Sequence, residues 1–276
     1  MGPLLARRAG CGGGSLGLTP ATALVDLVAT LAREAGALLL QRSLRAPTGI
    51  ASKSSLTDLV SDADRDADRL VVARIRAAFP DDAIVSEEGD AVAGRSGRTW
   101  YVDPLDGTIN YLYGVPHWSV SIACVDAEGA LAGTVFDPIR DEVFSAARGA
   151  GATLGSLRLA TTAVKDPGLA LVATGFSYDA TERAAQAAVA ARLAGSVRDL
   201  RRAGSAALDL AWVAAGRLDA YFEVSRSPWD SAAGELLVRE AGGAVTWTEH
   251  REIVASGHGV HTALLALLRA SHGSPG

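Results

Sequence analysis

The sequence predicts a mixed α and β protein built from layered sheets and helices. Three observations predict this class. Two segments near the N-terminus repeat apolar residues at the helical period, a run of short strand-like pieces follows them, and strands and helices alternate after Gly151. With 276 residues, 49% of them hydrophobic, the chain is long enough for one large domain or for two that share an interface.

In the first half of the chain, prolines mark the ends of the predicted helices. The first helix begins at Thr19-Pro20 and ends before Pro47, and the second runs from Asp62 to Phe79. Short apolar pieces separated by Gly, Asp-Pro and Asp-Ala-Glu-Gly predict a meandering sheet. Its expected strands are residues 83–86, 99–102, 120–125, 131–136 and 142–146.

Past Gly151, strands and helices are expected in alternation. The strands are residues 169–173, 197–199, 220–224 and 244–247, and the helices are residues 180–193, 205–216, 230–241 and 259–270. We therefore divide the chain into a leader (1–18), an α+β half (19–150), an α/β half (151–270) and a tail (271–276). The glycine-rich leader lacks the continuous apolar segment of a signal peptide, so we expect it to be disordered.

Composition excludes several classes of protein. The net charge of -5, with acids and bases interleaved, offers no basic stripe for nucleic acid. Two cysteines cannot build a disulfide framework or a thiolate metal site, and no stretch reaches eighteen unbroken apolar residues. We expect a cytoplasmic protein without a membrane or nucleic-acid partner.

The densest chemistry lies between Asp103 and Asn110, which read Asp-Pro-Leu-Asp-Gly-Thr-Ile-Asn. Two carboxylates three residues apart follow a strand-like Trp-Tyr-Val, and Glu87 also follows a predicted strand. Three hard oxygen donors suit Mg²⁺, and a pair of such ions about 3.5–4 Å apart would activate water and stabilise a leaving oxygen. If Gly107 and Thr108 open a helix, their N–H groups would bind an anion. Metal and phosphate are the predicted ligands.

Each acidic element taken alone also has an ordinary interpretation. Acids in a first helical turn, such as Asp62 to Asp68, complement the helix dipole, and Asp230 is a plausible N-cap. The histidines offer no ligand-pair spacing for zinc apart from His258 and His261, which we expect at the surface. The sequence contains no nucleophile elbow, Walker loop or dinucleotide fingerprint.

Two motifs together resemble the signatures of the inositol monophosphatase family. They are the octapeptide from Asp103 to Asn110 and Trp229-Asp-Ser-Ala-Ala-Gly234, and the similarity extends over about residues 20 to 270. The resemblance implies the layered α-β-α-β-α sandwich of the inositol monophosphatase/fructose-bisphosphatase type. It also implies a homodimer and inhibition by lithium.

The resemblance further implies roles for individual residues. Two or three Mg²⁺ ions would be held by Glu87, Asp103, the carbonyl of Leu105, Asp106 and Asp230. Asp64, chosen over Asp62 and Asp66 by resemblance alone, and Thr108 would orient and activate the attacking water, with Glu87 also catalytic. Gly107 and Thr108 would bind the phosphate beside Asp106 and Asp230, and Lys53 would lie in a loop closing over the metals.

The expected partner is a small phosphorylated polyol. Glu223 matches the acid that contacts inositol hydroxyls, and Ser205 and Ala206 match a sugar-facing loop, which favours myo-inositol 1-phosphate. Arg226 departs from the pattern and leaves a bisphosphate substrate open. Histidinol phosphate, fructose 1,6-bisphosphate and a 3′-phosphonucleotide are the alternative substrates, and a non-catalytic metal-binding protein is the remote alternative.

Overall fold

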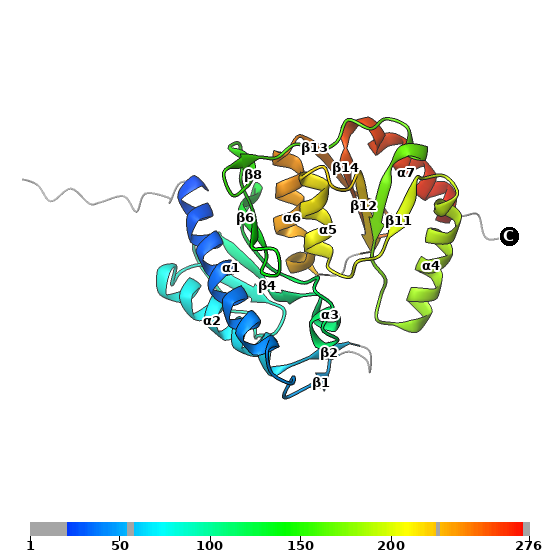
Figure 1. Ribbon diagram of the computed structural model, residues 1–276. Coiled ribbons are helices and arrows are strands. Elements are labelled where there is room, and N and C mark those ends of the chain that lie inside the picture. Colours follow the sequence, from blue (N-terminus) through cyan, green and yellow to red (C-terminus); the bar gives the residue numbers. More distant parts are fainter. Residues whose placement is uncertain (1–20, 54–57, 225–226, 273–276) are drawn as a thin grey trace, which may run out of the picture.

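The computed structural model describes residues 21–53, 58–224 and 227–272. Figure 1 shows five layers: two helices, a large sheet, two helices, a smaller sheet and two further helices. The predicted leader (1–18), residues 273–276 of the predicted tail and Arg226 lie outside the described residues. The expected α-β-α-β-α sandwich is confirmed.

The N-terminal half consists of an outer helical layer on a seven-stranded sheet. Helices α1 (Ala21–Ser43) and α2 (Asp62–Ala78) pack on one face of the sheet, with α1 against β5, β6 and β7 and α2 against β3 and β4. The sheet order is β3-β4-β5-β6-β7-β8-β9, antiparallel except for the β3–β4 pair. Its strands are Ala83–Ser86, Thr99–Asp106, Ser119–Asp126, Gly129–Asp137, Glu142–Ala147, Gly151–Leu154 and Leu157–Arg158.

Helices α5 (Ala206–Ala214) and α6 (Pro228–Glu240) form the middle layer between the two sheets. The second sheet has the order β11-β10-β12-β14-β13. Strand β10 is parallel to its neighbours β11 and β12, and β14 is antiparallel to its neighbours β12 and β13. Helices α4 (Ala180–Ala194) and α7 (His258–His272) cover its outer face. The strands are Asp199–Arg201, Leu171–Thr174, Ala220–Val224, Glu252–Gly257 and Gly243–Trp247.

Three hydrophobic clusters fill the spaces between these layers. One joins α1 and α2 to the large sheet around Trp100, one surrounds α5 and α6, and one lies under α4 and α7. The apolar faces of both sheets are therefore covered by helices, as a layered architecture requires. None of the helices within the described ranges is long and apolar enough to cross a membrane.

The sequence-based elements agree with most of this architecture, and the exceptions are short. The prediction missed the hairpin of β1 (Ala51–Ser52) and β2 (Leu59–Val60), the short strands β8 and β9 and the buried strand β14. The helix considered at Gly107 and Thr108 is present as the five-residue α3 (Thr108–Leu112). The large sheet continues to Arg158, beyond the boundary set at residue 150. Helix α7 includes His272, so the predicted tail begins too early.

One prediction concerns the tight contact between α5 and α6. A Cβ added to Gly234 would lie 2.5 Å from the Cβ of Leu210 and 2.6 Å from its Cδ1. Because that contact is between two buried helices, Gly234→Ala should lower the free energy of unfolding by about 1–3 kcal/mol, measured by urea denaturation.

The matched control is Gly195→Ala at the end of α4, where no atom lies within 4 Å of an added Cβ and φ is -77°. This variant should unfold at the wild-type urea concentration or slightly above it. Equal effects of the two substitutions would show that the close approach of α5 and α6 does not limit the packing of the middle layer.

Candidate active site

A cavity of about 600 Å³ lies between the two halves of the molecule. It is lined from the N-terminal half by the ends of β3 and β4 and from the C-terminal half by α5, β12 and the start of α6. Every predicted site residue lines it except Asp64, which is buried behind Thr108. The residues brought together are Lys53, Glu87, Asp103, Leu105, Asp106, Gly107, Thr108, Ser205, Ala206, Glu223 and Asp230.

The end of β4 places the octapeptide in the cavity wall. The pairing of β4 with β5 shifts register between Asp103 and Asp106, so both carboxylates leave the regular alternation of the strand. Gly107 then adopts a φ of +94° and precedes α3, which begins at Thr108. A side chain at Gly107 would be strained at this φ and would press on the carbonyl oxygens of His117 and Gly204 at 3.2 Å.

Asp64 connects the cap of α2 to Thr108. Its Oδ2 accepts hydrogen bonds from the backbone N–H and the hydroxyl of Ser61, which completes a capping box. Its Oδ1 lies 3.0 Å from Thr108 Oγ1, which is also 3.1 Å from the carbonyl oxygen of Leu105. Burial raises the pKa of Asp64, while the hydrogen bonds from Ser61 and Thr108 oppose that rise.

The other acids at the start of α2 face different partners. Asp62 accepts from Arg65 and Thr48 at the surface, and Asp66 pairs with Arg42 and Arg69. Among the four acids from Asp62 to Asp68, the hydrogen bond to the octapeptide is therefore made by Asp64.

Lys53 lies close to the acids at the end of β3. Its Nζ donates to Glu87 Oε1 at 2.7 Å and also to Glu88 Oε1. Burial alone would lower the pKa of Lys53, but the charges and hydrogen bonds of Glu87 and Glu88 outweigh it and raise this pKa. Burial raises the pKa of Glu88 to about 7 against the opposing effect of Lys53. This ammonium group partly neutralises the acidic wall.

Asp103 and Asp106 are destabilised in their charged forms by burial and by neighbouring acids. Burial raises the pKa of Asp103 well above its usual value, and the charges of Glu87, Asp106 and Asp230 raise it further. Burial raises the pKa of Asp106 to about 6, opposed by donors from the Ser205 hydroxyl and the Ala207 N–H. These carboxylates repel one another where burial weakens their solvation, so the arrangement favours added positive charge.

The donor atoms fit a hard divalent cation. Carboxylate oxygens and the Leu105 carbonyl are the ligands that Mg²⁺ prefers, and their mutual repulsion would be relieved by it. Across the described residues, however, no three His, Cys, Asp or Glu side chains already form a metal cage. In this structure each of three carboxylates already accepts a hydrogen bond from the protein. Lys53 Nζ donates to Glu87, the Leu105 N–H donates to Asp103, and the Ser205 hydroxyl donates to Asp106.

The far end of the cavity is formed by the C-terminal half. Ser205 caps α5, and Glu223 lies near the end of β12, where it accepts a hydrogen bond from the Tyr221 hydroxyl. Burial raises the pKa of Glu223 to about 7, although Tyr221 and Arg202 lower it. A side chain at Gly175 would overlap the Glu223 carboxylate, so this glycine makes room for the acid.

Sequence reasoning missed several polar residues that also line the cavity, among them Tyr178, Arg202 and Asp209. Asp209 was detectable as a lone acid inside the apolar helix that follows Ser205. Tyr178 and Arg202 stand in loops whose position depends on the tertiary fold, so no local pattern marks them. The expectation that His261 lies at the surface is wrong, because its ring is buried between Thr246 and Ser256.

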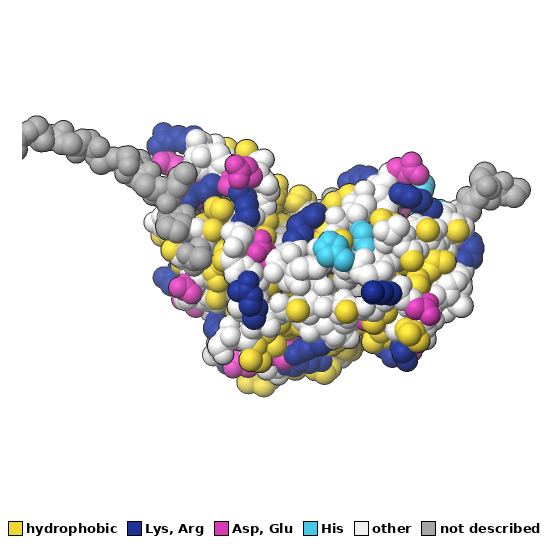
Figure 2. All heavy atoms as spheres, turned by 90° about the horizontal axis from the view of Figure 1, so that it is seen from above, with side chains coloured by type: hydrophobic (Ala, Val, Ile, Leu, Met, Phe, Trp, Pro, Cys, Tyr) yellow, Lys and Arg dark blue, Asp and Glu magenta, His cyan; other side chains and the backbone are white. Residues whose placement is uncertain are grey.

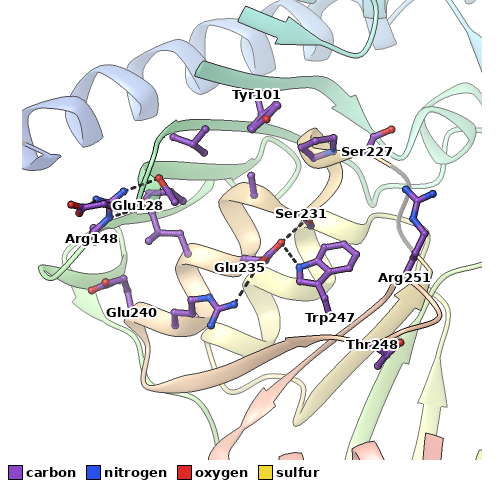
Figure 3. A pocket seen from close by; sticks show the side chains of 17 residues that line it. Tyr101, Glu128, Arg148, Ser227, Ser231, Glu235, Glu240, Trp247, Thr248 and Arg251 are labelled. Atoms are coloured by element: carbon purple, nitrogen blue, oxygen red, sulfur yellow. Dashed lines mark hydrogen bonds and ion pairs between the residues drawn. The ribbon is translucent and has the colours of Figure 1, made fainter. Parts of the chain in front are cut away.

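A larger cavity, of about 880 Å³, lies on the other side of the first turn of α6 (Figure 3). Ser231 and Trp247 both donate to Glu235 Oε1 there, and Arg148 is held by Asp126 and Glu128. None of the predicted site residues lines this cavity. Ser227 and Ser231, which were not predicted as site residues, line both cavities.

On the face in Figure 2, basic and acidic side chains are interspersed.

Comparison with known proteins gives concordant matches. The model of the inositol monophosphatase family matches residues 22–272. The Nus factor SuhB of Xylella fastidiosa is 45% identical over 222 residues, which cover 80% of each chain. The Nus factor SuhB of Escherichia coli is 40% identical over 226 residues, covering 81% of this chain and 84% of the relative. Because these relatives are named Nus factors, the absence of a nucleic-acid partner stays a prediction.

Solved structures show the same fold. The extragenic suppressor protein suhB of Bartonella henselae superposes with a TM-score of 0.85 at 34% identity, covering 92% of this chain and all of that one. The IMPase of Thermotoga maritima superposes with a TM-score of 0.81 at 32% identity, covering 90% and 97% of the two chains. These matches include both acidic motifs and both halves of the sandwich. The chain belongs to the inositol monophosphatase family.

Proposed function

We propose that the protein is a Mg²⁺-dependent phosphatase that hydrolyses myo-inositol 1-phosphate to myo-inositol and phosphate. The observation that carries this proposal is the meeting of the acidic wall, the Thr108–Asp64 hydrogen bond and Glu223 in one cavity. A related staphylococcal structure, with a TM-score of 0.74 and 25% identity, has inositol monophosphate bound, which supports the choice of substrate.

The residues that would hold two or three Mg²⁺ ions are Glu87, Asp103, Asp106, Asp230 and the carbonyl of Leu105. When bound, such ions supply positive charge for the phosphate and acidify water. Lys53 would have to release Glu87 for that carboxylate to serve as a ligand, since its Nζ is 2.7 Å from Glu87 Oε1.

Thr108 and Asp64 are proposed to activate the water that attacks phosphorus. When the Thr108 hydroxyl donates to Asp64, the lone pairs of its oxygen accept a hydrogen bond from water in the cavity. The Ser61 donors fix the other carboxylate oxygen, so Asp64 is oriented to receive the proton. Water oxygen bonds to phosphorus as the bond from phosphorus to the alcohol oxygen breaks, and the alcohol takes up a proton.

Three further properties belong to the same proposal. We propose that the enzyme acts in the cytoplasm, forms a homodimer and is inhibited by lithium, as the family resemblance implies. The buried Cys124 thiol, whose pKa is raised to about 12 by burial, is consistent with a cysteine that takes no part in the chemistry.

The proposed function predicts metal-dependent phosphate release. Purified protein with Mg²⁺ should release phosphate from inositol 1-phosphate faster than from fructose 1,6-bisphosphate, histidinol phosphate or 3′-phosphoadenosine 5′-phosphate, and EDTA should stop it. Preference for another ester would keep the metal chemistry and reject the substrate. Absence of release from all four esters would reject the phosphatase.

The water-activating pair predicts opposite results for two substitutions at one position. Thr108→Ala removes the hydroxyl and should lower kcat about 10²–10⁴-fold, because general-base activation is lost. Thr108→Ser keeps the hydroxyl and should retain most of the activity. Mg²⁺ binding measured by calorimetry should be similar in both variants, and an unchanged kcat for Thr108→Ala would contradict the assignment.

A second candidate function, a role as a Nus factor, is supported by the name of the relatives that are 40–45% identical. The Asp103→Ala variant separates it from catalysis. This substitution removes a predicted metal ligand and should abolish phosphate release, whereas Asp199→Ala on the exposed end of β11 should not. If both variants replace SuhB in Escherichia coli as well as the wild-type chain does, the two functions are independent.

A further inference from the structure

Asp209 is a buried acid that accepts no hydrogen bond at Oδ1 from the described residues. It lies in the first turn of α5, and it is 2% exposed. Within the described residues, no donor reaches its Oδ1. Its helical neighbours Leu208, Leu210 and Ala211 are fully buried and apolar.

This arrangement destabilises the protein when the cavity holds no substrate. A buried polar atom without a partner costs roughly 1–3 kcal/mol relative to a satisfied one, and an apolar residue of the same size would avoid that cost. Buried unsatisfied groups are uncommon in native proteins, so a specific one requires an explanation. The surroundings of Asp209 provide that explanation.

Asp209 lines the same cavity as the predicted phosphate site, on the side formed by the C-terminal half. Ser205 lies one turn earlier on α5, and Glu223 reaches the cavity from β12. After burial, the charge of Glu223 is the strongest factor that raises the pKa of Asp209, which shows that the two acids are electrostatic neighbours. A buried acid from α5 and a partly buried acid from β12 therefore face the end of the cavity that would receive the alcohol.

We propose that Asp209 is a substrate-recognition residue whose buried carboxyl group, unpaired in the cavity wall beside Glu223, binds a ring hydroxyl of a polyol phosphate. The inference rests on the proposed phosphatase function and narrows its substrate class. Together, Asp209 and Glu223 would read two hydroxyls of one ring, a requirement that inositol phosphates meet and simple aryl phosphates do not. Substrate binding would supply the hydrogen bond that the helix leaves unmade.

The chemistry of the site favours a hydroxyl over an ammonium group. Burial raises the pKa of Asp209 well above its usual value, and the charges of Glu223 and Asp106 add to this, with Arg202 opposing. The charged form is therefore disfavoured at this position, and the protonated form has one O–H donor and retains acceptor capacity, which matches a hydroxyl that also donates and accepts. An amine would need the charged form as its counter-charge, so the amine of histidinol phosphate is the poorer fit.

The test combines two substitutions with two substrates. Asp209→Leu removes both hydrogen-bonding atoms, and Asp209→Asn keeps one acceptor and a donor. We expect Asp209→Leu to lower kcat/KM for inositol 1-phosphate about tenfold or more, through KM, and to leave kcat/KM for phenyl phosphate within twofold. Asp209→Asn should retain at least a third of the wild-type kcat/KM for inositol 1-phosphate.

Thermal unfolding gives a readout that a purely structural acid would not produce. Because the unpaired carboxyl is removed, Asp209→Leu should raise Tm by about 2 °C or more. The control is Glu252→Gln, another buried acid, which contacts His272 and does not line the cavity. It should leave the ratio of the two kcat/KM values unchanged.

The outcomes separate the inference from the function on which it rests. If the wild-type protein hydrolyses neither ester with Mg²⁺, the proposed phosphatase fails. If it hydrolyses both and Asp209→Leu changes them equally, or lowers Tm, the recognition role of Asp209 is overturned. If Asp209→Asn and Asp209→Leu lower kcat/KM equally, and histidinol phosphate is the better substrate of the wild-type protein, Asp209 binds an ammonium group and the proposed contact with a hydroxyl is wrong.

Discussion

Repulsion among clustered carboxylates is the constraint on which this structure depends. Glu87, Asp103, Asp106 and Asp230 come from both halves of the sandwich and line one cavity. Two unit charges 4 Å apart interact with about 4 kcal/mol at an effective dielectric constant of 20, so several such pairs would cost a large part of a domain's stability. Lys53 contributes one positive charge. The layers must therefore hold the acids together against this repulsion, which the proposed Mg²⁺ ions would relieve, and the tightly packed α5 and α6 contribute to holding them.

The local structures that hold the acids also prepare them for chemistry. Asp64 closes the capping box of α2 with one oxygen and contacts Thr108 with the other. Ser205 caps α5 and at the same time donates to Asp106. Each of these side chains fixes a helix end and a site residue together, because it makes one hydrogen bond to the cap and another to the site. Folding of these helices and assembly of the site are thus a single event, and a substitution at either cap would disturb stability and function together.

The sequence predicted those parts whose signals are local. Helix α2 was correctly bounded, since an acidic first turn and Pro80 mark its ends, and Glu87 was correctly placed directly after a strand. Asp103 was also expected beyond its strand, but β4 continues past it to Asp106, with a register shift between the two acids. Strand β14 was missed although it pairs antiparallel with β13, the strand directly before it; only its pairing with β12 is non-local. The choice of Asp64 needed a family resemblance, and the structure supplies a physical reason, because Asp64 at the third helical position bonds back to Ser61 and across to Thr108. A lone acid in an apolar helix, such as Asp209, gains meaning only when the fold shows that it faces a cavity.

The two ends of the cavity are built on different principles. At the phosphate end, the positions of Asp103, Gly107 and Thr108 are fixed by the course of the backbone, since a register shift and a positive φ define them. At the alcohol end, the wall consists of side chains on α5 and β12, and Gly175 gives Glu223 its space. Replacing a side chain alters recognition without moving the backbone, whereas a change at the phosphate end disturbs the sheet itself. On the proposed function, the water-activating pair and most of the metal ligands would lie in the N-terminal half, and the choice among phosphorylated alcohols would be made in the C-terminal half, where an unpaired acid would exchange stability for recognition.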